Sequence, residues 1–478
     1  MQAAAANESS KQQALQTHNI MNEHKSILIN RRQFLCATGA GVAAFHLLPR
    51  SVVQGAERLA ANDKLNMAGI GIGSQGGSDV DEVAKLGHNI VALCDVDEKY
   101  AAKKFAQYPK ATQFKDFRVM LDKMHKEIDA VVIGTPDHTH TVIALAAMEH
   151  HKHVYCEKPL AHSVEEVRAL MKAATKYKVV TQLGNQGHSS GSIHRLCEWV
   201  WAGAIGQVHT VHAGCDAFKD VYCQLRNLDK LNQHYDVPAG LDYELWVGPV
   251  PFRPYAPFWV PWNWRGWMPF GTGAVGDWFC HVIDPTFWAL DLDAPSTVQA
   301  EVTGYDPATQ GLTYPPATKI TFEFPARNQR GPVTLVWYDG NNTIPRPQDF
   351  ASDDKVPGVG AILFGDKGMI MHGSHGGGGC RLLPETVMEQ YSGKNAPPEK
   401  LPRVKSHHWD WVDAIRSGRQ AGSNFGYGGP LTQAALIGAI AIRFPGQKLT
   451  WDNKKARFTN NNAANAYVHA GYRKGWSL

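Results

Sequence analysis

The stretch LNMAGIGIGSQGGSDV, residues 65–80, places an apolar strand directly before a loop with the spacing Gly-x-Gly-x-x-Gly. Glycines at these places permit a tight turn and let backbone amides approach a pyrophosphate, while the following helix presents its positive end. Such a loop alone is weak evidence in a chain with 45 glycines. The residues expected to contact a dinucleotide are Gly71, Ile72, Gly73, Ser74, Gln75 and Gly76.

A second apolar strand supplies the context that the loop alone lacks. Residues 89–94 are typical of a strand, and Asp95 stands at its end, about 20 residues after the loop. A carboxylate at this place accepts hydrogen bonds from the adenosine ribose hydroxyls. Val96 and Asp97 follow where a 2′-phosphate would require arginine. The pattern therefore predicts binding of NAD rather than NADP.

Strands and helices continue to alternate as far as residue 183. The predicted helices cover residues 78–86, 100–107, 117–124, 142–149 and 164–176, and further strands cover 128–134, 153–156 and 179–183. This alternation predicts a doubly wound parallel (Rossmann) sheet, whose ligands lie beyond the carboxyl ends of the strands. The loops 135–140 and 157–159 open at that edge. Their cofactor-binding candidates are Thr135, Pro136, His138, His140 and Glu157.

A glycine-rich approach at residues 271–276 leads into a segment with three regularly spaced polar residues. If residues 277–284 are helical, Asp277, His281 and Asp284 share one face. Asp277 suits the start of such a helix. Histidine titrates near neutrality and can accept the proton of an alcohol, and a nearby carboxylate can orient its ring. Alternatively, the polar residues of this helix merely cap it and pair with one another.

The segment VYCEKPL, residues 154–160, after the loop TPDHTH, residues 135–140, resembles the glucose–fructose oxidoreductase/inositol dehydrogenase (Gfo/Idh/MocA) family. The likeness extends from residue 63 to the YRKGW segment at 472–476, and it is greatest to the exported branch of that family. The resemblance implies that Lys158, Asp277 and His281 are catalytic. It also implies that Asp284 holds a second sugar hydroxyl. A lysine buried beside a pyridinium ring is expected to have a lowered pKa.

Residues 186–478 are expected to form an α+β domain for substrate binding and oligomerisation. After a helix at 193–202, strands are predicted at 208–213, 298–305, 318–324, 333–338 and 361–364, with a hairpin turn at 366–368. These strands imply an open, mostly antiparallel sheet, whose outer face needs cover; a homo-oligomer, dimer or tetramer, is therefore expected. The other predicted boundaries are 1–60 for an N-terminal extension and 61–185 for the NAD-binding domain. Residues from 451 onward are predicted to wrap around the fold.

An aromatic insertion at residues 246–267 is expected to wall the substrate pocket. Trp264 and Arg265 are predicted to lie nearest the reacting group. Packing of the insertion on itself or on a neighbouring subunit explains its composition equally well. Further substrate-binding candidates are Asn185, His188, His194 and Arg195.

The N-terminal segment has the features of a bacterial twin-arginine export signal. Arg31 and Arg32 precede Phe34-Leu35 and an apolar stretch at 36–48 that is too short to span a bilayer. We expect cleavage between residues 53 and 61, no membrane anchor and a periplasmic protein; a chance arginine pair before a buried helix is the alternative. Because this route carries folded proteins, a tightly bound NAD can be inserted before export. The eight scattered cysteines then need form no disulfide framework.

Composition narrows the range of partners. A formal net charge of +4, without a long basic run after the N-terminal segment, gives no sign of a nucleic-acid partner. The 22 histidines include adjacent pairs at 150–151 and 407–408 but no HExxH or comparable ligand set, so no metal is expected. The expected partner is a small carbohydrate or polyol.

Three functions compete on these observations. The first is NAD-dependent oxidation or reduction at a secondary hydroxyl of a sugar, sugar derivative or cyclitol. The second is redox-neutral cleavage of a glycoside through a transient keto-sugar. The third is a non-enzymatic sensor that binds NAD and a sugar. Retention of Glu-Lys-Pro at 157–159 and of His281 favours the first.

Overall fold

The apolar runs of residues 66–183 form a parallel sheet, because helices that alternate with the strands bury both of its faces. Its strand order is β3-β2-β1-β4-β5-β6, and every neighbouring pair is parallel. The strands are β1 (Asn66–Ile70), β2 (Asn89–Cys94), β3 (Thr112–Phe114), β4 (Ala130–Ile133), β5 (His153–Cys156) and β6 (Thr181–Leu183). The order reverses between β1 and β4, which is where ligands of such sheets bind. The predicted doubly wound sheet is confirmed.

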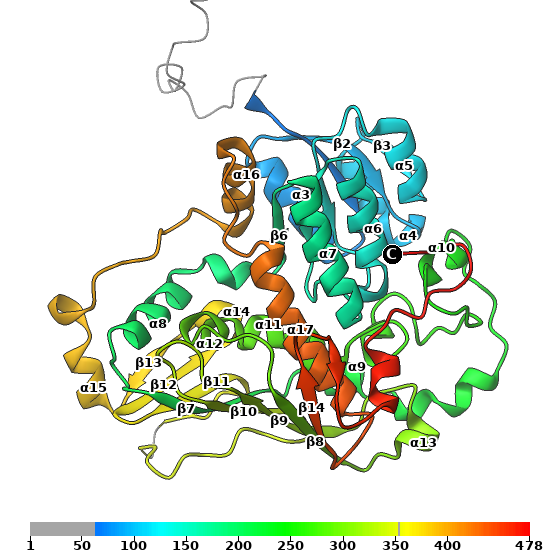
Figure 1. Ribbon diagram of the computed structural model, residues 1–478. Coiled ribbons are helices and arrows are strands. Elements are labelled where there is room, and N and C mark those ends of the chain that lie inside the picture. The colour runs from blue at the N-terminus through cyan, green and yellow to red at the C-terminus, as the bar shows by residue number, and fades with distance from the viewer. Residues whose placement is uncertain (1–62, 352–353) are drawn as a thin grey trace, which may run out of the picture. The chain divides into compact units, whose positions relative to one another are not determined.

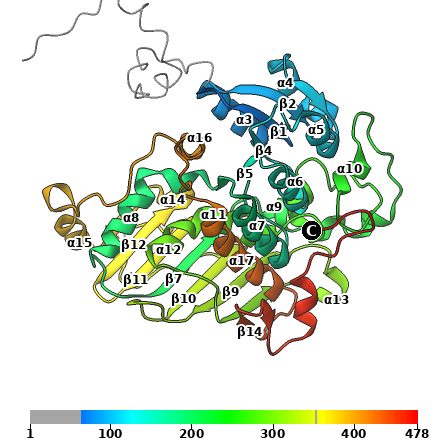
Figure 2. The same cartoon turned by 45° about the horizontal axis from the view of Figure 1, so that its top comes forward.

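The computed structural model describes residues 63–351 and 354–478, all within one unit that spans residues 60–478. The predicted export signal, with Arg31 and Arg32, lies outside the described residues. Within this unit the parallel sheet and its helices lie on one side of a second, broader sheet (Figures 1 and 2).

Local capping signals explain where most helices of the first sheet begin. Asp97 accepts hydrogen bonds from the first turn of α4, and Ser163 and Glu166 form a capping box on α7. The helices are α3 (Gln75–Lys85), α4 (Glu98–Gln107), α5 (Phe117–Met124), α6 (Asp137–Glu149) and α7 (Val164–Tyr177). Helix α6 begins five residues before the predicted position 142, so His138 and His140 lie in a helix and not in a loop.

The second sheet is mixed but mostly antiparallel, as predicted. Within the described residues its strand order is β13-β12-β11-β7-β10-β9-β8-β14-β15, and only β7 and β10 pair in parallel. The strands are β7 (Val208–Cys215), β8 (Thr297–Thr303), β9 (Ala317–Phe324), β10 (Val333–Gly340), β11 (Val359–Gly365), β12 (Gly368–Gly373), β13 (Arg381–Leu383), β14 (Lys448–Asp452) and β15 (Arg457–Phe458). Gly365 pairs with Gly368, so the hairpin turn consists of Asp366 and Lys367, and Gly368, predicted in the turn, already belongs to β12.

The helices of the second half cover mainly the sheet face that is turned toward the parallel sheet (Figure 1). They are α8 (Gly191–Trp201), α9 (Lys219–Tyr222), α10 (Tyr243–Val247), α11 (Gly273–Val282), α12 (Asp284–Ala289), α13 (Pro307–Gln310), α14 (Ser374–Gly377), α15 (Glu385–Gln390), α16 (His407–Ser417) and α17 (Phe425–Ala441). The segment predicted as one helix through Asp284 is therefore two helices. Pro285 occupies the first turn of α12, a position that suits proline at a helix start but not inside a helix.

Helix α17 connects the two sheets. It is apolar around its whole circumference and packs on α7 and β6 of the first sheet and on α11, β8 and β9 of the second. A Cβ on Gly438 would stand 2.5 Å from the Phe322 ring of β9, so the helix backbone lies directly against the second sheet. Helix α11 is thereby held at a fixed place between the sheets.

Candidate active site

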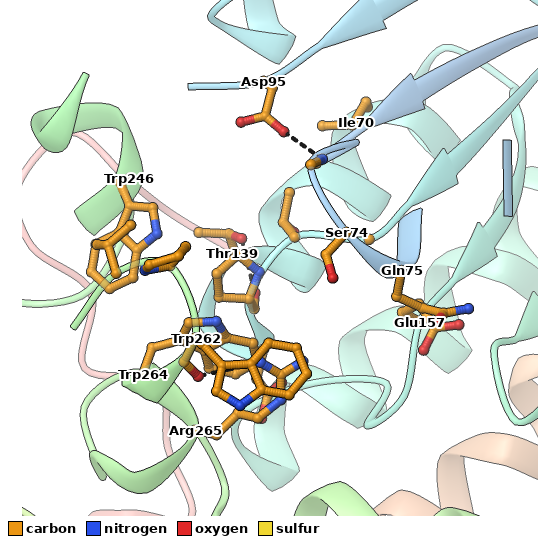
Figure 3. A pocket seen from close by; sticks show the side chains of 18 of the residues that line it. Ile70, Ser74, Gln75, Asp95, Thr139, Glu157, Trp246, Trp262, Trp264 and Arg265 are labelled. Atoms are coloured by element: carbon orange, nitrogen blue, oxygen red, sulfur yellow. Dashed lines mark hydrogen bonds between the residues drawn. The ribbon is translucent and has the colours of Figure 1, made fainter. Parts of the chain in front are cut away.

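A cavity of about 440 Å³ lies at the carboxyl edge of the parallel sheet (Figure 3). Its wall contains the glycine loop, the loops that follow β4 and β5, the aromatic insertion and helix α11. Lys158 and His281, 123 positions apart in the sequence, both line this one cavity. The convergence on which the enzymatic interpretation depends is therefore present.

The glycine loop forms a close-packed cradle at one end of the cavity. A Cβ on Gly76 would lie 2.2 Å from the Gly71 carbonyl oxygen, and a Cβ on Gly134 would lie 2.3 Å from the Gly76 Cα. These positions therefore accept no larger residue without movement of the backbone. Ser74 precedes α3 but makes no side-chain cap, and it lines the cavity with Gln75. The uncapped start of α3 suits a pyrophosphate.

Asp95 ties this loop to the end of β2. Its Oδ2 accepts hydrogen bonds from the backbone N–H of Ile72 at 2.8 Å and of Gly73 at 3.1 Å, and its Oδ1 accepts one from Asp97 at 3.0 Å. Burial raises the pKa of Asp95 to about 6, although these three N–H groups favour the charged form. The carboxylate lines the cavity and retains acceptor sites for ribose hydroxyls. The loop and Asp95 together fit NAD.

The adenosine end of the cavity is walled partly by residues far along the chain. Phe117, at the start of α5, lies opposite the indole of Trp476, with 6.3 Å between ring centroids. The Arg118 guanidinium lies 4.7 Å above the same indole. Arg473 holds the C-terminal segment in place, because it donates hydrogen bonds to the Gly248 carbonyl at 2.6 Å and to the Glu244 carbonyl at 3.0 Å.

Lys158 and Asp277 form an ion pair at the opposite end of the cavity. The Lys158 Nζ donates hydrogen bonds to the Asp277 carboxylate and, at 3.1 Å, to its backbone carbonyl. The Tyr222 hydroxyl donates to Asp277 Oδ2 at 2.5 Å, and the Arg265 Nε lies 3.4 Å from the same oxygen. Asp277 lies in the second turn of α11, which begins at Gly273, and not at a helix start as predicted. This carboxylate orients the lysine and shows no hydrogen bond to His281.

The ion pair sets the charge of both partners. Burial on its own would lower the pKa of Lys158, but the carboxylates of Asp277 and Glu157 outweigh it and raise that pKa above its usual value. The pKa of this lysine is therefore raised, opposite to the expected lowering. Burial opposes ionisation of Asp277, yet Lys158 and Arg265 hold its pKa well below the usual range.

His281 is a buried, neutral imidazole in the same cavity. Burial, followed by the charge of Lys158, lowers the pKa of His281 well below its usual value. Its Nδ1 is buried without a hydrogen-bond partner in the described structure. The His375 ring stacks on it with centroids 4.1 Å apart. His375 adopts a left-handed backbone (φ 53°) in the α14 turn, a conformation that non-glycine residues keep only under tertiary constraint.

Several predicted site residues lie away from the cavity wall. Asp284 accepts hydrogen bonds from Asn185 Nδ2 at 3.0 Å and from the Tyr427 hydroxyl at 2.6 Å, and His188 Nδ1 lies 3.0 Å from it. This cluster is buried and connects α12 to the segment that follows β6. The other predicted residues that do not line the cavity are Ile72, Gly76, His138, His140, His194 and Arg195. Those that line it are Gly71, Gly73, Ser74, Gln75, Asp95, Thr135, Pro136, Glu157, Lys158, Trp264, Arg265, Asp277 and His281.

His138 and His140 hold neighbouring segments together. Both ring nitrogens of His138 face backbone carbonyls, of Trp246 at 2.9 Å and Phe270 at 3.2 Å. Those of His140 face the carbonyls of Pro159 at 2.9 Å and Thr135 at 2.8 Å. The two side chains thus hold the aromatic insertion and the loop of Lys158 in place from behind the cavity wall, which they do not line.

The cavity wall also contains Tyr222, Trp278, His375 and Trp476, which were not singled out from the sequence. The run HGSHGGGG, residues 372–379, is a signal that draws attention to His375, because consecutive glycines permit unusual backbone conformations. The other three carry no local signal. In the described part of the chain no group of three or more His, Cys, Asp or Glu residues is arranged to hold a metal, and no helix has the length and apolarity to cross a membrane.

Two sequence models of one oxidoreductase family match the chain. The model of its NAD-binding Rossmann fold matches residues 65–185, and the model of its C-terminal alpha/beta domain matches residues 201–324. Together they cover more than half of the chain. The match agrees with the strand order and the glycine cradle described above.

Individual relatives match the chain at low sequence identity and over only part of its length. Levoglucosan dehydrogenase of Pseudarthrobacter phenanthrenivorans is 26% identical over 192 residues, 40% of this chain and 40% of that protein. Glycosyl hydrolase family 109 protein 1 of Bacteroides fragilis is 35% identical over 122 residues, 24% of this chain and 26% of that protein. The matched part of the chain thus spans less than half of either relative.

A solved structure shares the fold over a greater length. The inositol dehydrogenase homologue of Azotobacter vinelandii, in complex with NADH and myo-inositol, superimposes with a TM-score of 0.53 at 15% identity, over 81% of this chain and 98% of that chain. The family suggested by the Glu-Lys-Pro segment is confirmed, whereas its exported branch stays a prediction. Residues 65–185 are an NAD-binding Rossmann domain, and the chain belongs to the Gfo/Idh/MocA oxidoreductase family.

Proposed function

We propose that this protein is an NAD-dependent oxidoreductase that acts on a secondary hydroxyl of a sugar, sugar derivative or cyclitol. The observation that carries the proposal is that Lys158 and His281 line the same cavity as the glycine loop. One relative named above is a levoglucosan dehydrogenase, which is named for a sugar derivative. The solved structure named above contains myo-inositol, a cyclitol. The proposed net reaction converts a secondary alcohol and NAD⁺ into a ketone, NADH and a proton.

Each side chain has a separate part in this proposal. NAD, held by the glycine loop and Asp95, would supply the acceptor for the hydride that leaves the carbon bearing the hydroxyl. His281, neutral because burial lowers its pKa, accepts the hydroxyl proton. The Lys158 Nζ donates a hydrogen bond to the same oxygen, and Asp277 holds the ammonium in position with help from the Tyr222 hydroxyl.

A second candidate is redox-neutral glycoside cleavage through a transient keto-sugar. One observation favours it, the likeness to a glycosyl hydrolase family 109 protein. A cofactor that is regenerated in each cycle also suits a protein exported with NAD bound.

One experiment separates these functions. Purified protein is incubated with free sugars, cyclitols and glycosides while NADH absorbance and glycoside cleavage are followed together. Stoichiometric NADH supports the oxidoreductase, and cleavage without net NADH supports the redox-neutral enzyme. If no compound gives NADH or is cleaved, both enzymatic functions are refuted and the non-enzymatic sugar sensor remains. The His281→Asn variant is expected to lose either activity, whereas His234→Asn, whose side chain is 89% exposed, serves as the control.

Location and assembly are proposed on separate grounds. We propose export by the twin-arginine route, from the Arg31-Arg32 segment, with NAD tightly bound; fractionation of cells that express the chain, with an Arg31→Lys/Arg32→Lys control, tests it. We also propose a homo-oligomer, because helices α8, α11, α12 and α17 cover only one face of the second sheet (Figures 1 and 2). Light scattering of the purified protein measures its mass.

A further inference from the structure

A row of aromatic rings leads from the buried imidazole of His281 to the surface. The Trp278 ring lies 6.0 Å from the His281 ring, and the Phe218 ring lies a further 6.0 Å from Trp278. The Trp262 ring follows at 6.3 Å from Phe218. All four side chains line the same cavity, so the row is continuous with the proposed reaction site.

The outer rings of this row are exposed to solvent. Phe218 is 52% exposed and Trp262 is 38% exposed. Trp278 is held within the row, since its Nε1 donates a hydrogen bond to the Tyr222 hydroxyl at 2.8 Å. Trp262 is held by Arg265, whose guanidinium lies 4.1 Å above its ring. Single exposed apolar side chains are common on protein surfaces, but a contiguous group of them beside a cavity indicates a binding surface.

The backbone at Phe218 is strained in a way that places its ring at the rim. Its φ of 52° and ψ of 34° are left-handed, a conformation that is a clear outlier for a bulky residue. Such conformations persist only where the surrounding structure imposes them, and they cluster at functional sites. Phe218 immediately precedes α9, which carries Tyr222 and hence contacts the Lys158–Asp277 pair.

We propose that Phe218, Trp262 and Trp278 form a second sugar subsite, and that the substrate is a glycoside or disaccharide. This inference rests on the proposed function. The ring that reacts lies beside His281, and the next ring of the substrate lies on the three aromatic side chains. A pyranose has apolar C–H faces and a polar edge, which suits aromatic faces bordered by the Arg265 guanidinium and the His375 imidazole. A single sugar ring beside His281 leaves the Phe218 and Trp262 rings uncovered.

The test compares matched pairs of probes: methyl pyranosides of common hexoses and the disaccharides that carry the same non-reducing ring. For the pair that reacts, kcat/KM for the disaccharide is expected to exceed that for the methyl pyranoside about tenfold, as expected for one added stacking contact. Phe218→Ala is expected to lower kcat/KM for the disaccharide about tenfold more than for the methyl pyranoside. Phe252→Ala, an equally exposed phenylalanine that does not line this cavity, is the control.

Equal kcat/KM for both members of the pair, or equal loss in Phe218→Ala, would overturn the subsite and leave the proposed function intact. The proposed function itself is decided separately by the wider panel of free sugars, cyclitols and glycosides, and if none of the present probes is turned over, calorimetry decides the subsite. In that case His281→Asn protein loaded with NAD is titrated with the same pairs. Tighter binding of the disaccharide, lost in His281→Asn/Phe218→Ala, supports the subsite; equal or undetectable binding of both refutes it.

Discussion

Replacement of Trp476 by alanine tests how the adenosine end of the cavity is built. Its indole packs beside Phe117 and beneath the Arg118 guanidinium, so it forms part of the aromatic wall where the adenine of NAD would lie. The wild-type residue is expected to bind the base by stacking. The Trp476→Ala variant should therefore bind the adenosine half of NAD more weakly and the nicotinamide half as before.

The size of the effect follows from this geometry. Removal of one aromatic ring that stacks on a base costs about 1–3 kcal/mol. Trp476 is only partly buried and Phe117 remains, so the lower part of this range applies, about 1–2 kcal/mol. Since 1.4 kcal/mol corresponds to a factor of ten, the Kd for AMP should rise about 5- to 30-fold.

The assay is calorimetric titration of cofactor-stripped protein with AMP and, separately, with nicotinamide mononucleotide. Trp201→Ala is the matched control, because this tryptophan is 41% exposed and lies outside the cavity. An unchanged Kd for AMP in Trp476→Ala would refute the stacking argument. An equal loss for AMP and nicotinamide mononucleotide would show instead that the whole cavity is disturbed.

Three further outcomes follow from the site. Asp277→Asn removes the charge that offsets the burial of Lys158, so the pKa of that lysine should fall and kcat should drop about 100-fold or more. The measurement is the pH profile of kcat. Asp220→Asn, which changes a 94% exposed carboxylate, should leave that profile unchanged. Because burial holds the pKa of His281 well below 6.5, its proton-accepting form persists at that pH, and kcat/KM should stay level as the pH falls through 6.5 and decline only below it; a decline centred on 6.5 in the pH–rate profile would contradict this. Gly134→Ala places a Cβ 2.3 Å from the Gly76 Cα, which should lower stability by about 1–3 kcal/mol and weaken NAD binding, as measured by chemical denaturation and NAD titration; Gly331→Ala, where a Cβ meets nothing within 4 Å, should do neither.

The first sheet and its cofactor site could be predicted because their signals are local. The glycine loop and Asp95 lie within one strand–helix–strand unit, and β2 has its predicted bounds, residues 89–94. Two errors had signals that were present in the sequence. Proline at 136 with Asp137 favours a helix start there, and Asp284-Pro285 favours a new helix over a continued one.

The remaining site residues could not be found by local reasoning. Tyr222 contacts Asp277 from a different segment, and Trp476 reaches Phe117 across most of the chain. Neither residue was marked by its neighbours in the sequence as a site residue. Each reaches the cavity only because the two sheets pack together. The raised pKa of Lys158 is likewise a property of the assembled ion pair, because burial alone predicts the opposite direction.

The position of helix α17 between the sheets determines how the protein comes apart. Because this one apolar helix packs on elements of both sheets, its detachment would expose the interiors of both halves at once. Residues 63–185 produced as a fragment would also lack Trp411, which packs with Met67 and Leu93 in their shared core. We therefore expect that the cofactor-binding half does not fold on its own and that the two halves melt together as a single cooperative event.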